Sequence, residues 1–100
     1  MRRYRARYTP EAAERIRKLH PEIQKQIRAA ADRLLQSPLE GHALQEELSG
    51  LQSYRVGRYR LIYRISDSER MIEILLVGPR RDIYQELRKS LLRERSHGRL

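Results

Sequence analysis

The sequence of 100 residues contains no cysteine, phenylalanine or tryptophan, and only five glycines and four prolines. Because cysteine is absent, the chain can form no disulfide, no thiolate nucleophile and no cysteine-ligated zinc site. The histidines His20, His42 and His97 are too far apart along the chain to show the spacing of a metal-binding motif. Glycine-rich phosphate loops and serine-triad motifs are also missing. We therefore predict a function that uses neither a metal nor a small-molecule cofactor.

Long hydrophobic runs are absent too, since the longest one spans only Ile74 to Val77. A transmembrane helix needs about 20 apolar residues, and a secretion signal needs an apolar stretch that residues 1–8 lack. Apolar residues make up 39% of the chain, which is enough for the small core of one domain. We predict a single domain over residues 1–100 that is cytoplasmic and not bound to a membrane, with residues 96–100 as a frayed tail.

What the sequence has in excess is positive charge of one chemical kind. Its formal net charge is +9, and 19 of its 22 basic residues are arginine. The charge is concentrated in residues 1–8, 53–84 and 85–100, whereas residues 9–52 are close to neutral. Arginine binds phosphate through a planar fork and stacks on bases, so this distribution favours a polyanionic partner such as RNA. A GC-rich genome is the alternative explanation for the total arginine content.

Two helices are indicated in the first half of the chain. Residues 2–8 alternate weakly as a short strand, and Thr9-Pro10-Glu11 then carries the hydroxyl cap, the proline and the acid of a helix start. His20-Pro21-Glu22 separates this helix from a second one, which Ser37-Pro38 ends. The short link between the helices predicts a hairpin whose apolar faces pack on a sheet. Residues 39–52 follow as a connector.

The second half of the chain has the period-two pattern of strands. We predict strands over residues 54–56, 59–65 and 71–77, the last apolar at nearly every position, as in a strand covered on both faces. Apolar residues at helical spacing predict a last amphipathic helix over residues 82–95. The predicted fold class is α+β, with the order β-α-α-β-β-β-α and a mostly antiparallel four-stranded sheet packed on the N-terminal helical hairpin.

The middle strand of this second half gives the clearest site geometry. Its alternation places Arg60 and Arg64 on one face and two tyrosines on the other. A guanidinium on a strand is held rigidly, as the stabilisation of transition-state charge requires. Arg80 and Arg81 follow the next strand, and Tyr84 lies one turn into the last helix, so all three are within reach of the same area. The alternative is that the arginines are merely solvated and the strand tyrosines belong to the core.

Two segments of the chain resemble the RelE/ParE superfamily of toxins from bacterial and archaeal toxin–antitoxin systems. They are LSGLQSYRVGRYRLIYRI at residues 48–65 and VGPRRDIY at residues 77–84, and the similarity extends over nearly the whole chain. RelE-type members cut messenger RNA in the ribosomal A site without a metal, by attack of a 2′-hydroxyl on the adjacent phosphate. The resemblance implies a type II toxin with this endoribonuclease activity, whose partners are messenger RNA, the ribosome and a cognate RelB-like antitoxin.

The resemblance also implies roles for individual residues. Arg60 matches the arginine that stabilises the developing charge on the phosphate, and Arg55 matches a basic residue of the preceding strand. Arg80 matches the arginine that assists the leaving oxygen or the phosphate, and Tyr84 matches the tyrosine that stacks on or orients the nucleotide. The further residues expected to contact RNA are Arg58, Arg64 and Arg81, the last being also the substitute for Arg80.

The sequence departs from the family pattern at two positions. Gly57 stands where the strand carries a second basic residue, and Pro79 replaces the histidine or lysine of the turn. Arginine is not deprotonated in proteins, so no general base is assigned. Two alternatives therefore stay open, which are a ParE-like inhibitor of DNA gyrase and a catalytically impaired RNA-binding relative.

Overall fold

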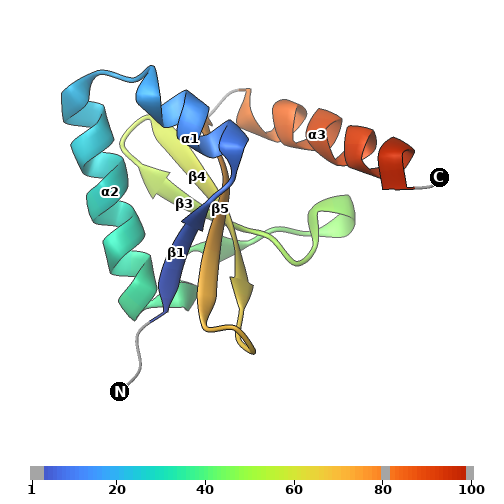
Figure 1. Cartoon of the computed structure of the whole chain (residues 1–100), viewed down its shortest axis with the longest axis horizontal. Helices are drawn as coiled ribbons and strands as arrows, with labels where there is room; N and C mark the ends of the chain where they lie inside the picture. Colours follow the sequence, from blue (N-terminus) through green and yellow to red (C-terminus); the bar gives the residue numbers. More distant parts are fainter. Residues whose placement is uncertain (1–3, 80–81, 99–100) are drawn as a thin grey trace.

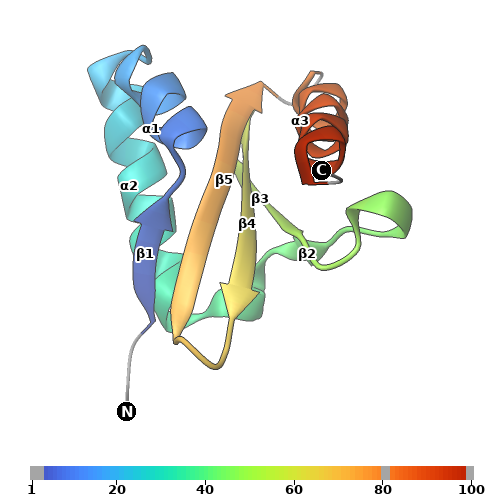
Figure 2. The ribbon, with the colours of Figure 1, turned by 45° about the vertical axis from the view of Figure 1, so that its right-hand side comes forward.

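A five-stranded mixed sheet lies between a helical hairpin on one face and a single helix on the other (Figures 1 and 2). The computed structural model describes residues 4–79 and 82–98. In chain order the elements are β1 (Arg5–Tyr8), α1 (Pro10–Arg17), α2 (Pro21–Gln36), β2 (His42–Ala43), β3 (Gln52–Val56), β4 (Tyr59–Ser66), β5 (Met71–Pro79) and α3 (Ile83–Gly98). Single 3-10 turns at Pro38–Glu40 and Glu46–Leu48 lie in the connector.

The α+β fold class is confirmed, and the strand count needs a correction. The strands lie in the order β1-β5-β4-β3-β2, where β1 runs parallel to β5 and all other pairs are antiparallel. The additional strand is β2, whose two residues pair with Ser53 and Gln52 of β3. So short a strand carries no period-two pattern, and the sequence gives no signal for it. Helix α3 ends three residues beyond the predicted range of 82–95.

Both predicted helix starts are confirmed by their caps. The Thr9 hydroxyl accepts a hydrogen bond from the Ala12 amide at 3.1 Å and donates one to the Leu75 carbonyl of β5 at 2.9 Å. At the second start, His20 Nδ1 accepts from the Glu22 amide at 3.1 Å, as expected for a boundary residue. Thr9 thus caps α1 and at the same time ties it to the sheet.

The sheet separates two hydrophobic clusters, one on each of its faces, and its strand β5 contains a β-bulge. Ile62 pairs with Leu76 and Tyr63 pairs with Ile74, so Leu75 is the extra residue of β5. The alternation of β4 continues through the bulge. Its residues Leu61 and Tyr63 join the cluster under α1 and α2, whereas Ile62 joins the cluster under α3. The latter, which we call the α3 cluster, consists of Leu48, Leu51, Ile62, Leu76, Ile83 and Leu87, with Tyr84 packed against it.

Tyr63 is a core residue, as the alternative reading of the strand tyrosines expects. Its side chain is fully buried, and its hydroxyl donates to the Pro38 carbonyl at 2.6 Å and accepts from the Gly41 amide at 3.1 Å. Burial is the main cause of the raised pKa of this phenol. The ring therefore fixes the connector that leads into β2 and β3.

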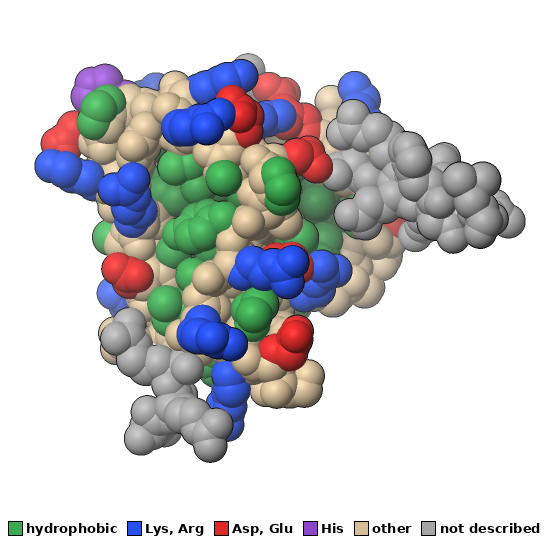
Figure 3. All heavy atoms as spheres, in the orientation of Figure 1, with side chains coloured by type: hydrophobic (Ala, Val, Ile, Leu, Met, Phe, Trp, Pro, Cys, Tyr) green, Lys and Arg blue, Asp and Glu red, His purple; other side chains and the backbone are tan. Residues whose placement is uncertain are grey.

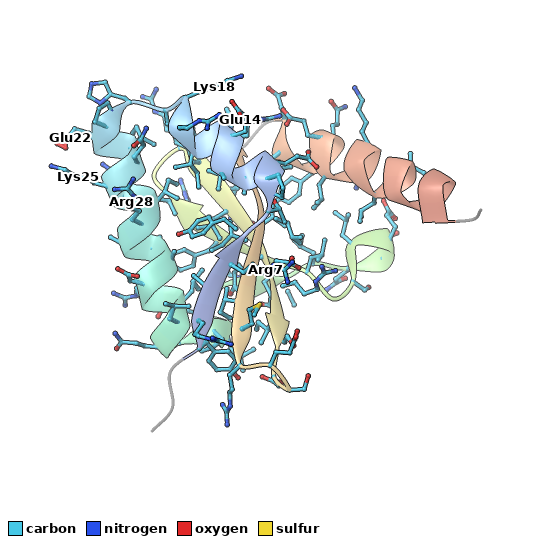
Figure 4. All side chains as sticks on the ribbon, viewed as in Figure 1. Arg7, Glu14, Lys18, Glu22, Lys25 and Arg28 are labelled. Carbon is cyan, nitrogen blue, oxygen red and sulfur yellow. The ribbon has the colours of Figure 1, made fainter. Side chains whose placement is uncertain are left out.

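The face that carries the helical hairpin has an open apolar groove with charged side chains around it (Figure 3). The groove has a volume of about 500 Å³, and its apolar lining comes from Ala6, Tyr8, Ala13 and Ile16. Figure 4 shows charged side chains of both helices, among them Lys18, Glu22 and Lys25, pointing outward from the hairpin, and Arg28 is one of the residues that line the groove. No helix among the described residues has the length and apolar character needed to cross a membrane.

Candidate functional site

Two arginines face each other across the hairpin formed by β3 and β4. Arg55 of β3 pairs in register with Arg60 of β4, which in turn pairs with Gly78 of β5. Residues directly opposite each other on antiparallel strands share a face, and like charges in such positions are destabilising. Ser53, two residues before Arg55 on the same face, contacts Tyr84 of α3. The arginine pair therefore lies on the α3 side of the sheet, near the end of β5.

The turn between β3 and β4 determines this register. Val56 pairs with Tyr59, which leaves only Gly57 and Arg58 in the loop. Gly57 has a φ of +60°, a conformation that two-residue hairpin turns require and that glycine adopts without strain. Gly57, which stands where the family pattern has a basic residue, is thus needed for the tight turn that aligns Arg55 with Arg60.

Arg60 carries a buried donor that nothing in the described chain satisfies. Its side chain is half-buried, and its Nε atom is inaccessible to solvent and has no hydrogen-bond partner among the described residues. A buried N–H group without a partner is destabilising by about 1–3 kcal/mol. The arrangement of Arg60 is therefore not explained by the stability of the fold, and strained or unsatisfied groups of this kind concentrate at functional sites.

Six arginines of the described chain have acidic partners, whereas Arg5, Arg28 and Arg70 have none among the described residues. Arg15 is paired with Glu86 of α3, and Arg88 Nε lies 2.7 Å from Glu47 Oε1. By contrast, Arg55, Arg58 and Arg60, which we call the arginine cluster, have no ion pair with any residue that the structure describes; Arg55 Nε contacts only the Gly57 carbonyl, at 3.5 Å. The cluster presents uncompensated positive charge with free donors, which is the arrangement that binds phosphate.

Tyr84 lies beside this cluster and is neither sealed in the core nor free. Its ring packs against the α3 cluster and is half-buried, and its hydroxyl is 3.1 Å from the Ser53 hydroxyl. Tyr84 is placed in the first turn of α3, and α3 approaches the sheet closely at Gly78. A Cβ atom at Gly78 would lie 2.9 Å from Ile83 Cδ1, so a side chain at this position would require the buried Ile83 side chain to shift.

The structure brings together three of the residues predicted for the site, namely Arg55, Arg60 and Tyr84, with Arg58 in the adjoining turn. Arg64 lies further along the same face of β4, about 13 Å from Arg60 at the usual rise per residue. Its guanidinium is bound to Glu73 at 2.5 Å, beside a hollow of about 270 Å³ under α3. Arg80 and Arg81 lie outside the described residues, and their roles stay predictions.

The described residues offer no obvious metal site. No group of three or more His, Cys, Asp or Glu side chains in the described ranges is arranged to hold a metal ion. What the site offers chemically is cationic donors on two strands and a half-buried aromatic ring on a helix. Such a set can bind a phosphate and orient an adjoining planar group.

Comparison with known proteins identifies the relatives of the chain. The family model described as the ParE toxin of the type II toxin–antitoxin system parDE matches residues 6–84. Toxin RelG of Mycobacterium tuberculosis is 40% identical over 84 residues, which cover 82% of this chain and 97% of RelG. The chain belongs to the RelE/ParE superfamily of type II toxins.

Solved structures of this RelE/ParE superfamily have the same fold. The toxin–antitoxin complex RelBE2 of Mycobacterium tuberculosis contains a chain that is 38% identical, with a TM-score of 0.74, and the match covers 79% of this chain and all of that one. The isolated RelE toxin of Escherichia coli is 24% identical with a TM-score of 0.68, covering 88% of this chain and 98% of that one. The latter likeness is one of fold alone. The predicted family is therefore confirmed.

Sequence reasoning missed one residue of the site, which is Ser53. Its position on β3 gives it the same face as Arg55, but a single serine in a strand has no motif that would distinguish it. Only the contact with Tyr84, which lies 31 residues further along the chain, connects Ser53 with the site.

Proposed function

We propose that this toxin is a metal-independent endoribonuclease that cleaves messenger RNA on the ribosome. The observation that carries the proposal is the buried, unpartnered Nε of Arg60 opposite the unpaired Arg55. A phosphate seated on this pair would accept hydrogen bonds from the guanidinium groups and relieve the repulsion between the two cations. The similarity to Toxin RelG and to a chain of the RelBE2 complex supports the part of the proposal that makes this protein a toxin.

In the proposed reaction a ribose 2′-oxygen attacks the adjacent phosphorus. The bond between O2′ and phosphorus forms and the bond between phosphorus and O5′ breaks, while O2′ loses its proton and O5′ gains one, which leaves a cyclic phosphate and a 5′-hydroxyl. Negative charge accumulates on the non-bridging oxygens, where Arg60 and Arg55 would donate hydrogen bonds. A preorganised donor of this type contributes about 10²–10³-fold to the rate. Tyr84 would orient the nucleotide by stacking, and Arg80, with Arg81 as substitute, would assist the leaving oxygen.

The proposal assigns no general base. Arginine does not give up its proton, so Arg55 cannot take the proton of the 2′-hydroxyl. Catalysis would then rest on charge stabilisation and on positioning, and correct positioning alone is able to supply about 7–11 kcal/mol of the barrier. An enzyme of this type depends on its substrate being held in a bent conformation, which the ribosome would provide.

The proposed protein partner is a RelB-like antitoxin. The support comes from the similar chain of RelBE2, whose structure is that of a toxin–antitoxin complex. A net charge of +9 favours a partner with acidic segments. Because its substrates would be translating ribosomes and their messages, the site of action of the toxin would be the cytoplasm.

A second candidate function is inhibition of DNA gyrase, in the manner of ParE toxins. The observation in its favour is that the matching family model is the one described as ParE toxin. A gyrase inhibitor acts by binding a protein and does not require a phosphate site, so the unpaired arginine cluster counts against it. A third candidate, an RNA-binding relative without activity, would keep the cluster and lack cleavage.

Induction of the toxin followed by mapping of message ends separates the three candidates. We expect discrete cuts within translated codons and none in untranslated messages. Arg60→Ala should abolish growth inhibition and cleavage, whereas the control Arg17→Ala, an arginine of α1 that is paired with Glu14, should retain both. Double-strand DNA breaks with intact messages would replace the proposal by the gyrase function. RNA binding with neither kind of break would leave the inactive relative.

A further inference from the structure

We infer that Ser53 is a positioning residue, which holds the Tyr84 ring at a fixed place beside the arginine pair. Among the described residues, Ser53 is a polar residue that is buried in the core, with an exposed fraction of 1%. Its hydroxyl is 3.1 Å from the Tyr84 hydroxyl, and either group can be the donor. The inference rests on the proposed function, because it assigns Tyr84 the task of orienting a nucleotide.

The surroundings of Ser53 would suit an apolar side chain. Its cross-strand neighbour on β4 is Ile62, a fully buried member of the α3 cluster. Strand positions of this kind favour branched apolar residues, and a buried hydroxyl is tolerated only when it finds a partner. Tyr84 is the partner here. A serine at this position therefore gives the fold little that valine or alanine would not, and its distinctive contribution is the contact with Tyr84.

The contact places the ring relative to the phosphate-binding donors. Ser53 and Arg55 are two residues apart on the same face of β3, which is about 7 Å along the strand. Arg55 in turn lies opposite Arg60. Because Ser53 belongs to the sheet, the hydroxyl contact transfers the rigid spacing of β3 to a side chain of α3. Without it, the Tyr84 ring would be held only by its apolar packing and could rotate about its χ angles.

A double-mutant cycle distinguishes positioning through Tyr84 from a general structural effect. On a ribosome-bound message, Ser53→Ala should lower the cleavage rate at saturating toxin by about 2- to 12-fold, the rate equivalent of one neutral hydrogen bond. Tyr84→Phe should lower it similarly, and the double variant should be no slower than Tyr84→Phe alone. Ser53→Thr, which keeps a hydroxyl, should restore part of the rate. If the rate reductions of the two single variants multiply in the double variant, Ser53 and Tyr84 act independently and the inference is overturned.

A second measurement does not depend on cleavage. In toxin labelled with 3-fluorotyrosine, the ¹⁹F resonance of Tyr84 is the one that Tyr84→Phe removes from the set of six. We expect Ser53→Ala to shift or narrow this resonance and to leave the other five in place, because the ring gains freedom to rotate. The control is Ser66→Ala, a serine at the far end of β4 whose hydroxyl contacts Glu69. It should change neither the Tyr84 resonance nor the cleavage rate.

The two measurements separate the failure of this inference from the failure of the proposed function. If the wild-type toxin cuts no message while Ser53→Ala still alters the Tyr84 resonance alone, the nuclease proposal falls and the positioning contact stands. If the wild-type toxin cuts messages and Ser53→Ala changes neither the rate nor the resonance, the positioning role is refuted. If Ser53→Ala changes the positions of all six resonances, Ser53 supports the fold as a whole, and the positioning role is also refuted.

Discussion

Replacing Arg60 by methionine should make the protein more stable and at the same time inactive. Methionine keeps the length and the apolar stem of the side chain, and it removes the charge and the unpartnered donor. Most substitutions at buried positions are destabilising, so a gain in stability would be a distinctive result. It would indicate that Arg60 is retained for its function although it destabilises the fold.

The size of the gain follows from two features of the site. A buried donor without a partner destabilises a protein by about 1–3 kcal/mol, and like charges opposite each other on a sheet add about 0.2–1 kcal/mol. Nε of Arg60 is such a donor, and Arg55 is the opposing charge. Allowing for the packing that the guanidinium provides, we expect a gain of about 1–2 kcal/mol, or roughly 4–16 °C in Tm for a domain of this size.

Urea unfolding at pH 7 measures this gain, with cleavage of ribosome-bound message as the second readout. Arg64→Met is the matched control on the same face of β4, because its guanidinium contacts the partly buried Glu73 at 2.5 Å. The control should lose up to about 1 kcal/mol of stability, since the ion pair is broken. The reasoning is refuted if Arg60→Met lowers the free energy of unfolding by more than about 1 kcal/mol, since Arg60 would then be a structural residue.

Three further predictions concern the connector and the charge of the site. Hydrogen bonds from Tyr54 and Arg33 lower the pKa of the Glu40 carboxyl. The ionised carboxylate therefore contributes fully to the free energy of unfolding above the usual carboxyl pKa of about 4.3, and this contribution is lost as the pH falls through the lower folded-state pKa. Glu40→Gln should thus be less stable than the wild type at about pH 6 and equal to it near pH 2 in urea titrations; a constant difference would contradict this. Gly41→Ala should lower the free energy of unfolding by about 1–3 kcal/mol, because the added Cβ would lie 2.6 Å from the Tyr63 hydroxyl and 2.8 Å from the Ser53 carbonyl. Thermal unfolding measures this loss, and an unchanged Tm would show that the connector moves to accommodate the Cβ. Arg55→Ala should reduce the slope of log affinity against log salt for single-stranded RNA by about 0.7, and an unaltered slope would remove Arg55 from the phosphate contacts.

The fold was predictable where the signals are local. Thr9 and His20 act as caps within three residues of their own position, and each is followed by a proline that fits the first helical turn. The alternation along β4 correctly separates Tyr63 from Ile62, because the bulge inserts its extra residue into β5 and leaves the period of β4 intact. Strand β2 was missed because two residues show no period, and its existence depends on pairing with β3.

The site was predictable in part. The alternation of β4 and the family resemblance were sufficient to select Arg55, Arg60 and Tyr84, which the structure places on one side of the sheet. They also selected Arg64 as a further RNA contact, and the structure pairs its guanidinium with Glu73 of the neighbouring strand. Whether a given arginine has an acidic partner depends on which strand lies beside it, and no pattern along a single strand contains that information.

The amino-acid sequence by itself determined the positive charge, the helix starts and the alternating faces of the strands, since each of these depends on composition or on residues a few positions apart. The tertiary structure alone decided which charges are neutralised and which donors are left free. Arg15 meets Glu86 across 71 positions, and Ser53 meets Tyr84 across 31. Such contacts form only when the strands and α3 have packed, so the unsatisfied Arg60 and the serine that holds Tyr84 are properties of the fold.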